Sequence, residues 1–382
     1  MLRVILIVFI LLFATGWPSN VINRIDDRET RVRDVIGGEL EENEFPGIQY
    51  LVVDKDTTLF SYAGGIADIA ANRAMRDNTT MMIYSMTKTI TAAAVLLLVE
   101  RGEIALEDPV TRYLPDIPYG KEVKIRHLLS QTSGIPNPIP LRWIHLAEEH
   151  AHFDQQAALR EILEENPELD FTPGDRFAYS NISYWLLGYV IEKASGTGYE
   201  EYVRQNVFRK LAIPEAEIGF VIPSPEHHAK GYLPKWSLMN IFKSFVVDSR
   251  FAGDYEDNWL HVYDHYLNGP SFGGVIGTAH AIGIFLRDQL QDTSRLVSPE
   301  TKALFFQQQK DNQGQPIPMT LGWHIGSVDG VQFFFKEGGG GGFRSEMRIY
   351  PSAGIASVVM VNNASFNPGA FLKNVDREFF KK

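Results

Sequence analysis

The sequence predicts a mixed α/β fold of the α+β kind: an antiparallel sheet formed by both chain ends, flanked by helices and carrying an inserted, mostly α-helical subdomain. Strand-like runs rich in β-branched and aromatic residues occupy both ends, about residues 45–80 and 318–382. Between them, about residues 81–317, hydrophobic residues recur mainly at helical spacing. The economical arrangement places both terminal strand blocks in one sheet.

The composition fits one large globular domain. The chain has 382 residues, of which 45% are hydrophobic and 22% charged, enough for a sizeable core. A formal net charge of −11 argues against nucleic acid as a partner, because binding to nucleic acid requires a concentrated positive face. The absence of cysteine excludes disulfides, thiolate chemistry and Cys-ligated metals.

Residues 1–20 read as a secretory signal peptide or an N-terminal membrane anchor. Arg3 precedes an unbroken apolar run, Val4–Phe13, which small residues follow. The run lies within the ~7–15 residues of a signal-peptide core and is shorter than the ~20 of a spanning helix. A buried first strand or helix is the alternative. We therefore expect an exported protein, periplasmic or extracellular, or one attached to the membrane by an uncleaved segment.

A polar connector, residues 21–44, leads into a single predicted domain, residues 45–382. The stretch "IQYLVVDKDTTLFSYAGGIAD" predicts two strands joined by a polar turn. Four further strands are predicted near the C-terminus, in "TLGWHIG", "VQFFFK", "FRSEMRIY" and "GIASVVMVN". A last amphipathic helix is predicted at about residues 369–381.

The middle of the chain predicts helices over Ser85–Arg101 and in "ISYWLLGYVIEKASG", "GYEEYVRQNVFRKL" and "AHAIGIFLRDQL". The first is apolar on nearly every side, so we expect it between the sheet and the helical part, its N-terminal residues facing a cleft. The aromatic-rich segment Val221–Ser271 is weakly periodic. It is either ordinary packing of the helical part or a cap over the cleft.

"YSMTK" places Ser85 and Lys88 on one face of the predicted helix. The partial positive charge at a helix N-terminus favours a developing oxyanion and disfavours a lysine ammonium, which makes Lys88 a plausible base for Ser85. The alternative is a capping serine beside a solvated lysine. Spacing alone does not decide between them.

Two further motifs supply partners. "AYSNISYW" presents Tyr179 and Asn181 from a loop just before a helix, with capping and packing as the alternative roles. "FFFKEGGGGGF" ends a strand at Lys336 and continues with the glycines 338–342. Without side chains there, a substrate can lie along the backbone edge and use its N–H groups.

Together these motifs resemble the serine β-lactamase and penicillin-binding superfamily, especially the class C β-lactamases, family VIII esterases and D-amino-acid peptidases. The resemblance covers about Phe45 to Phe366, including the connecting segments "IRHLLSQTSGIPN" and "FTPGDRFAYSN". It implies a β-lactamase/transpeptidase-like fold. Its three motifs, in the family's order, are Ser85-Met-Thr-Lys88, Tyr179-Ser-Asn181 and Lys336-Glu-Gly338.

The resemblance implies a role for each motif residue. Ser85 attacks an acyl carbonyl, while Lys88 and Tyr179 move its proton, and either of these two is the working base. Asn181 orients Lys88 or the substrate amide, and Lys336 adds positive potential. The backbone N–H groups of Ser85 and Gly339, next to Gly338, form the oxyanion hole. No cofactor and no metal are implied.

Glu337 departs from the family pattern, which has a hydroxyl or small residue at this position. A glutamate repels a substrate carboxylate unless strand alternation turns it away, so we expect a neutral ester or amide substrate.

The alternative functions are those of a D-Ala-D-Ala carboxypeptidase, a class C-like β-lactamase, or a non-catalytic penicillin-recognising binding or sensor protein. The partner is then a small-molecule or peptide substrate. Gln131 stands where relatives often have His, and the histidines at 145, 150, 152, 261 and 265 are expected to lie on the surface or to pack rather than to bind zinc.

Overall fold

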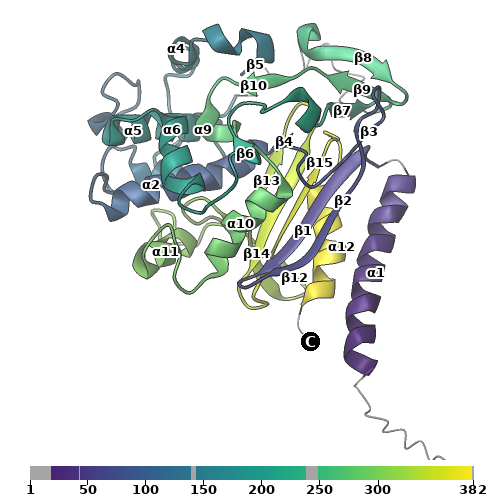
Figure 1. Ribbon diagram of the computed structural model, residues 1–382. Coiled ribbons are helices and arrows are strands. Elements are labelled where there is room, and N and C mark those ends of the chain that lie inside the picture. The colour runs from purple at the N-terminus through teal and green to yellow at the C-terminus, as the bar shows by residue number, and fades with distance from the viewer. Residues whose placement is uncertain (1–18, 43, 139–142, 238–247, 381–382) are drawn as a thin grey trace, which may run out of the picture.

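The computed structural model describes residues 19–42, 44–138, 143–237 and 248–380. Its centre is a seven-stranded antiparallel sheet in the order β12-β13-β14-β15-β1-β2-β3 (Figure 1). The strands are β1 (Gly47–Asp54), β2 (Thr58–Asp68), β3 (Arg73–Ala74), β12 (His324–Val328), β13 (Val331–Gly339), β14 (Arg344–Tyr350) and β15 (Ile355–Val361). β1 pairs with β15, which confirms that both chain ends build one sheet.

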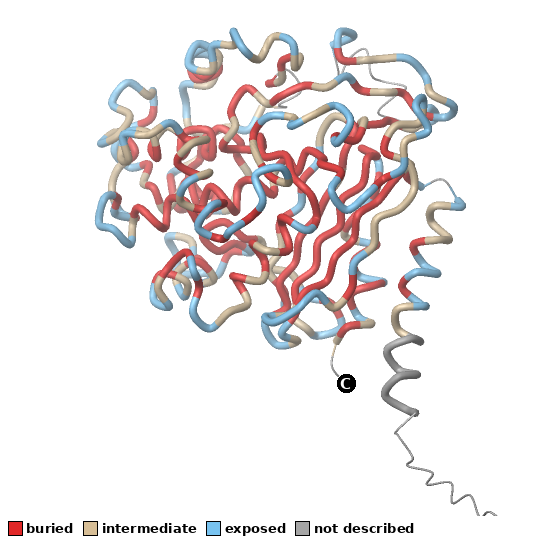
Figure 2. The backbone as a smooth tube through the Cα atoms, viewed as in Figure 1, coloured by how far each residue is buried: buried red, intermediate tan, exposed pale blue. Residues whose placement is uncertain are grey.

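The central strands are buried on both faces because each face meets its own core. Along β1, Leu51 and Val53 belong to the core on one side, whereas Tyr50 and Val52 belong to the core on the other. β15 is buried at every position. Buried backbone accordingly runs through these strands, while exposed residues gather on the loops and outer helices (Figure 2).

Helix α10 (Ala279–Leu290) packs against β1 and β15 on one face of the sheet. Thr278 caps it, accepting from the Ala281 N–H. On the other face lie α12 (Pro368–Val375) and the 3₁₀ turn Asp376–Phe379, which together replace the predicted helix at about residues 369–381 (Figure 1). Helices therefore cover both faces, as predicted.

The chain before β1 is helical where a connector was expected. Helix α1 (Ser19–Glu41) places Val32 and Ile36, both fully buried, against the core that α12 also covers. Arg31 pairs with Glu378 at 2.7 Å. The apolar run of residues 1–18 lies outside the described residues. Of the helices within the described ranges, none has the length and apolarity needed to cross a membrane.

The helical part is built around α2 (Thr87–Glu100), which packs against α5 (Asn181–Ser195), α6 (Tyr199–Val203), α9 (Pro270–Gly273) and α11 (Pro299–Phe306). Nearly every residue of α2 is buried, as its all-round apolar sequence predicts. The 3₁₀ turn η1 (Tyr84–Met86), which precedes this helix, packs against β13 and β14 and so joins the helical part to the sheet. The described residues also form α3 (Ile125–Leu129), α4 (Gln155–Glu165), a π-helical turn, Arg204–Phe208, and several short 3₁₀ turns.

The inserted part contains more strand than predicted. Val221–Ser271, expected to be helical packing or a cap, holds the sheet β7-β9-β8 and the strand β10, which pairs with β5. A third small sheet has the order β4-β11-β6. These strands are β4 (Met81–Met82), β5 (Ile144–Leu146), β6 (Ile218–Gly219), β7 (Gly231–Pro234), β8 (Ala252–Glu256), β9 (Trp259–Val262), β10 (His265–Leu267) and β11 (Ile276–Gly277).

Candidate active site

Ser85 lies in the turn η1, immediately before α2, and is partly exposed. It does not cap a helix, because neither η1 nor α2 has a side-chain hydrogen bond at its N-cap. Instead the Ser85 Oγ lies 3.1 Å from the Lys88 Nζ and 2.8 Å from the Tyr179 hydroxyl. The three side chains predicted to meet therefore do so, because both Lys88 and Tyr179 lie within hydrogen-bonding distance of the Ser85 Oγ.

Lys88 is fully buried and has two firm hydrogen-bond acceptors besides Ser85. Its Nζ donates to the Asn181 Oδ1 at 2.7 Å and to the Phe272 carbonyl at 2.6 Å. Burial, with a smaller contribution from the Lys336 charge, holds the pKa of Lys88 well below its usual range. In its neutral form the amine has two N–H groups, which these two acceptors would take, leaving the lone pair for the Ser85 Oγ.

Tyr179 lies in the loop that enters α5, and Asn181 is the first residue of that helix. Ser180 between them caps this helix by accepting from the Ser183 N–H, which leaves its two neighbours free to face Ser85 and Lys88. The Tyr179 hydroxyl donates to the Ser85 Oγ. Burial raises the pKa of Tyr179, so the phenol is protonated in this arrangement.

Lys336 points into the site from β13 and is 1% exposed. Its Nζ lies 4.8 Å from the centre of the Tyr179 ring. Burial lowers the pKa of Lys336 to about 7. Gly338 is buried against Ile83, the residue that precedes the turn η1. A Cβ added at Gly338 would lie 2.0 Å from the Ile83 carbonyl oxygen. Gly339 ends β13 opposite Arg344.

His324 is a site residue that the sequence analysis missed. Its Nε2 lies 3.0 Å from the Lys336 Nζ, and its ring stacks on Tyr179 with centroids 6.3 Å apart. Burial and the two lysine charges keep the pKa of His324 well below its usual range, so the neutral Nε2 accepts from Lys336. The available signal was strand pairing, because His324 on β12 lies opposite Phe335, next to Lys336. The Phe272 carbonyl, a backbone group, had no sequence signal.

Gln131 and Glu337 are the two departures from the family pattern. The Gln131 Oε1 accepts from the Ser180 N–H at 2.6 Å and so supports the loop that carries Tyr179. Glu337 is exposed, and strand alternation places its side chain on the face of β13 opposite Lys336. In the register of β13 and β14, Glu337 lies directly opposite Glu346.

Of the clustered histidines, His145 and His150 pack against each other and against aromatic rings, whereas His152 is exposed. His145 and His150 stack, with the Nε2 of one 2.9 Å from the Nδ1 of the other, and Phe153 stacks on His145 at 3.8 Å. Within the described ranges, no group of three or more His, Asp or Glu side chains is arranged to hold a metal ion.

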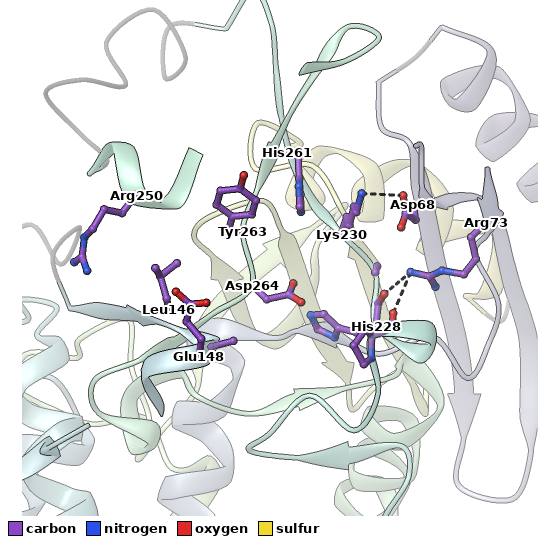
Figure 3. Close-up of a pocket in the computed structure, with 13 residues that line it drawn as sticks. Asp68, Arg73, Leu146, Glu148, His228, Lys230, Arg250, His261, Tyr263 and Asp264 are labelled. Carbon is purple, nitrogen blue, oxygen red and sulfur yellow. Dashed lines mark hydrogen bonds and ion pairs between the residues drawn. The ribbon is translucent and has the colours of Figure 1, made fainter. Parts of the chain in front are cut away.

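A pocket of about 520 Å³ lies between β2, β7 and the start of β10, lined by both acidic and basic side chains (Figure 3). None of the predicted site residues lines it. Its charges are largely paired: Lys230 contacts Asp68 at 3.1 Å and Glu256 at 2.7 Å, and Arg73 donates to the His228 carbonyl. The pocket is therefore separate from the Ser85 cluster.

The model of the beta-lactamase family matches residues 32–378, which span the sheet, the helical part and all three motifs. The chain belongs to the beta-lactamase family. It is a serine hydrolase-type member of a group that contains β-lactamases, penicillin-binding proteins and esterases.

The chain is similar to two curated relatives and to one solved structure. The chain is 28% identical over 315 residues to penicillin-binding protein 4* of Bacillus subtilis, covering 81% of this chain and 66% of that protein. It is 35% identical over 215 residues to esterase EstB of Burkholderia gladioli, covering 53% and 54%. The matches thus span between half and two thirds of these relatives. The D-amino acid amidase of Ochrobactrum anthropi SV3 shares the fold, with a TM-score of 0.71 at 21% identity over 94% of this chain and 97% of that one.

Proposed function

We propose that this protein hydrolyses a neutral ester or amide through an acyl-enzyme on Ser85. The observation that carries the proposal is the hydrogen-bonding pattern of Lys88, whose two N–H groups are taken by Asn181 and Phe272 while its third direction faces the Ser85 Oγ. This is the arrangement a general base requires.

In the first half-reaction the Ser85 Oγ transfers its proton to Lys88 and attacks the acyl carbon. The carbonyl oxygen becomes an oxyanion facing the N–H groups of Ser85 and Gly339. Tyr179, whose hydroxyl is 2.8 Å from the Oγ, gives its proton to the leaving alkoxide or amine. The resulting phenolate is balanced by the ammonium groups of Lys88 and Lys336.

The second half-reaction returns both protons. Tyr179, now a phenolate, takes a proton from a water molecule. The oxygen of this water molecule attacks the carbonyl carbon of the acyl-enzyme. Lys88 then gives its proton back to the departing Ser85 Oγ, and the acid product leaves. Each residue ends in the state in which it began, so no cofactor is consumed.

The preference for a neutral substrate over a carboxylate-bearing lactam or D-Ala-D-Ala peptide does not rest on Glu337, because strand alternation turns its side chain to the face of β13 opposite Lys336. The likeness to EstB agrees with an ester substrate. The β-lactamase and carboxypeptidase alternatives share the same acyl-enzyme chemistry and differ only in the substrate. A binding or sensor protein with this fold would differ in that it does not turn over a substrate.

Labelling with a fluorophosphonate probe, followed by intact-mass measurement, tests the nucleophile. We expect one adduct on the wild type and none on Ser85→Ala. Ser61→Ala is the matched control, because Ser61 is exposed on β2, away from the cluster. An unlabelled wild type, or an adduct that persists in Ser85→Ala, would overturn the proposal.

A substrate panel tests the specificity. We expect short-chain p-nitrophenyl esters to be cleaved faster than nitrocefin, with D-amino-acid amides as the third class. Faster opening of nitrocefin would overturn the preference for a neutral substrate while leaving the nucleophile in place.

A further inference from the structure

Tyr84, the residue before the nucleophile, has an unusual backbone conformation and a buried side chain. Its φ is +45°, a left-handed conformation that is costly for an aromatic residue and persists only where the surroundings enforce it. The Tyr84 hydroxyl donates to the Gly341 carbonyl at 2.8 Å and lies 3.0 Å from the His265 Nε2. The conformation thus brings the phenol from the nucleophile turn to the glycine run.

The Tyr84 ring also lies directly on the glycine run that follows Lys336. A Cβ added at Gly340 would lie 2.4 Å from the ring, closer than any side chain tolerates. A Cβ at Gly341 would lie 2.9 Å from the His265 ring. These glycines are needed for contact with Tyr84 and His265, and not only for an open edge along which a substrate can lie.

His265 fixes the position of the Tyr84 hydroxyl. It begins β10 and is 2% exposed. Its Nδ1 lies 2.8 Å from the Tyr263 carbonyl, so the neutral ring carries its proton on Nδ1 and the Nε2 is an acceptor. Burial lowers the pKa of His265, which keeps the ring neutral. Tyr84 therefore offers one proton to two acceptors, the His265 Nε2 and the Gly341 carbonyl.

We infer that Tyr84 and His265 are positioning residues that clamp together the two halves of the oxyanion hole. One half is the N–H of Ser85, adjacent to Tyr84 in the chain. The other is the N–H of Gly339, two residues before Gly341. Neither side chain contacts the substrate, so the clamp acts on the transition state only by positioning the backbone N–H groups of Ser85 and Gly339. It rests on the proposed acyl-enzyme function, because it has no role without an oxyanion at this place.

The clamp assigns a role to the aromatic segment Val221–Ser271, which supplies His265. It also predicts a kinetic signature. Donors that are slightly misplaced weaken the transition state but not ground-state binding of a small ester, so kcat falls while KM stays the same. A misplacement near 1 Å costs up to about 10²-fold in rate.

Three variants separate positioning from general stability. Tyr84→Phe keeps the ring on Gly340 and removes both hydroxyl contacts. His265→Gln places an amide near the Nε2 position, within reach of Tyr84. His265→Asn places it near the Nδ1 position, where it reaches only the Tyr263 carbonyl. Gln and Asn are alike in chemistry and differ mainly in which ring nitrogen they replace.

With a p-nitrophenyl ester we expect Tyr84→Phe to lower kcat about tenfold or more at unchanged KM. His265→Asn should lower kcat less, and His265→Gln should retain more activity than His265→Asn although both melt at similar temperatures. Fluorophosphonate labelling rates should follow the same order, because the adduct also places an oxygen in the oxyanion hole.

Equal activity of the Gln and Asn variants, or a Tyr84→Phe protein with wild-type kcat, would overturn the clamp. So would losses of kcat that follow the melting temperature alone. These outcomes are distinct from failure of the proposed function, which shows in the wild type itself as absence of the Ser85 adduct. If Tyr84→Phe does not fold, the comparison of His265→Gln with His265→Asn decides.

Discussion

At the scale of single residues, the site consists of buried amines whose charges are controlled by their neighbours. Lys88 and Lys336 are both buried, and each lies within 5.0 Å of the centre of the Tyr179 ring. Two ammonium groups so close together disfavour one another, which helps to keep Lys88 in the neutral form that a base needs.

The pH dependence of activity tests this coupling. Removing the Lys336 charge stabilises the Lys88 ammonium, so its pKa rises and the neutral base forms only at higher pH. In Lys336→Met, the acid limb of the kcat/KM profile on a neutral ester should therefore move to higher pH than in the wild type. A limb that stays in place or moves to lower pH would contradict the coupling. Lys373→Met, exposed on α12, is the control.

His324 gives a second residue-scale prediction. It accepts from the Lys336 Nζ and stacks on Tyr179, so it holds the lysine over the phenol ring. His324→Leu should reduce kcat/KM about tenfold, since it leaves a buried amine without this partner. His324→Gln, which keeps an acceptor near the Nε2 position, should retain more activity. Equal losses in the two variants would show that ring packing, not the hydrogen bond, matters.

At the scale of elements, the C-terminal turn is fixed to the sheet by one buried carboxylate. Asp376 accepts at 2.7 Å from the hydroxyls of Tyr50, Tyr350 and Ser357, which come from β1, β14 and β15. Three strands and the end of α12 thus share one hydrogen-bonding centre on the face of the sheet away from Ser85.

Replacing this carboxylate should destabilise the protein without altering its chemistry. Asp376→Ala leaves three buried hydroxyls without their acceptor, at about 1–3 kcal/mol for each group left unsatisfied. We expect the free energy of unfolding in urea to fall by roughly 3 kcal/mol or more, while kcat/KM of the folded protein is unchanged. Lys373→Ala on α12 should have little effect on either quantity.

The elements also show where prediction from sequence succeeds. β1, β2 and β15 are long segments in which β-branched or aromatic residues recur, bounded by turn residues, so their type and place follow from local pattern. β7 to β10 were missed because each has five residues or fewer, too short for a period to be visible. α1 was missed because its buried positions, Val32 and Ile36, gain their partners only through tertiary packing, in a core that combines β1, β2 and the far end of the chain.

In the site, the motif residues were predictable because each chemical group lies on a side chain at recognisable spacing. Lys88, Tyr179 and Lys336 belong to three separate motifs that the fold brings together. His324, His265 and the Phe272 carbonyl were not predictable, because their contacts depend on strand register and tertiary packing.

At the scale of the whole molecule, the sheet separates two hydrophobic cores, of which one adjoins the candidate active site and the other does not. Ser85 and its partners adjoin the larger core, shared by the helical part and α10, whereas α1 and α12 cover the smaller core on the other face. Changes in the smaller core should therefore alter stability while leaving catalysis intact.

Two valines of α1 test this separation. Val32 is fully buried and Val35 is 38% exposed on the same helix. Val32→Ala should lower the free energy of unfolding by about 2 kcal/mol, since it removes two buried methyl groups and leaves a cavity. Val35→Ala should change it by less than about 0.5 kcal/mol. Neither should change kcat/KM, and a loss of activity in Val32→Ala at full folding would contradict the separation of the two cores.

The pairing of β1 with β15 has a consequence for biosynthesis. β1 leaves the ribosome long before β15 is translated, so the N–H and C=O groups along one of its edges have no partner strand while the helical part is being completed. Assembly of the sheet must be a late event, dominated by contacts distant in sequence, and such contacts make folding slow. The nascent chain then carries an uncovered strand edge for most of its synthesis, which makes it a natural client for chaperones.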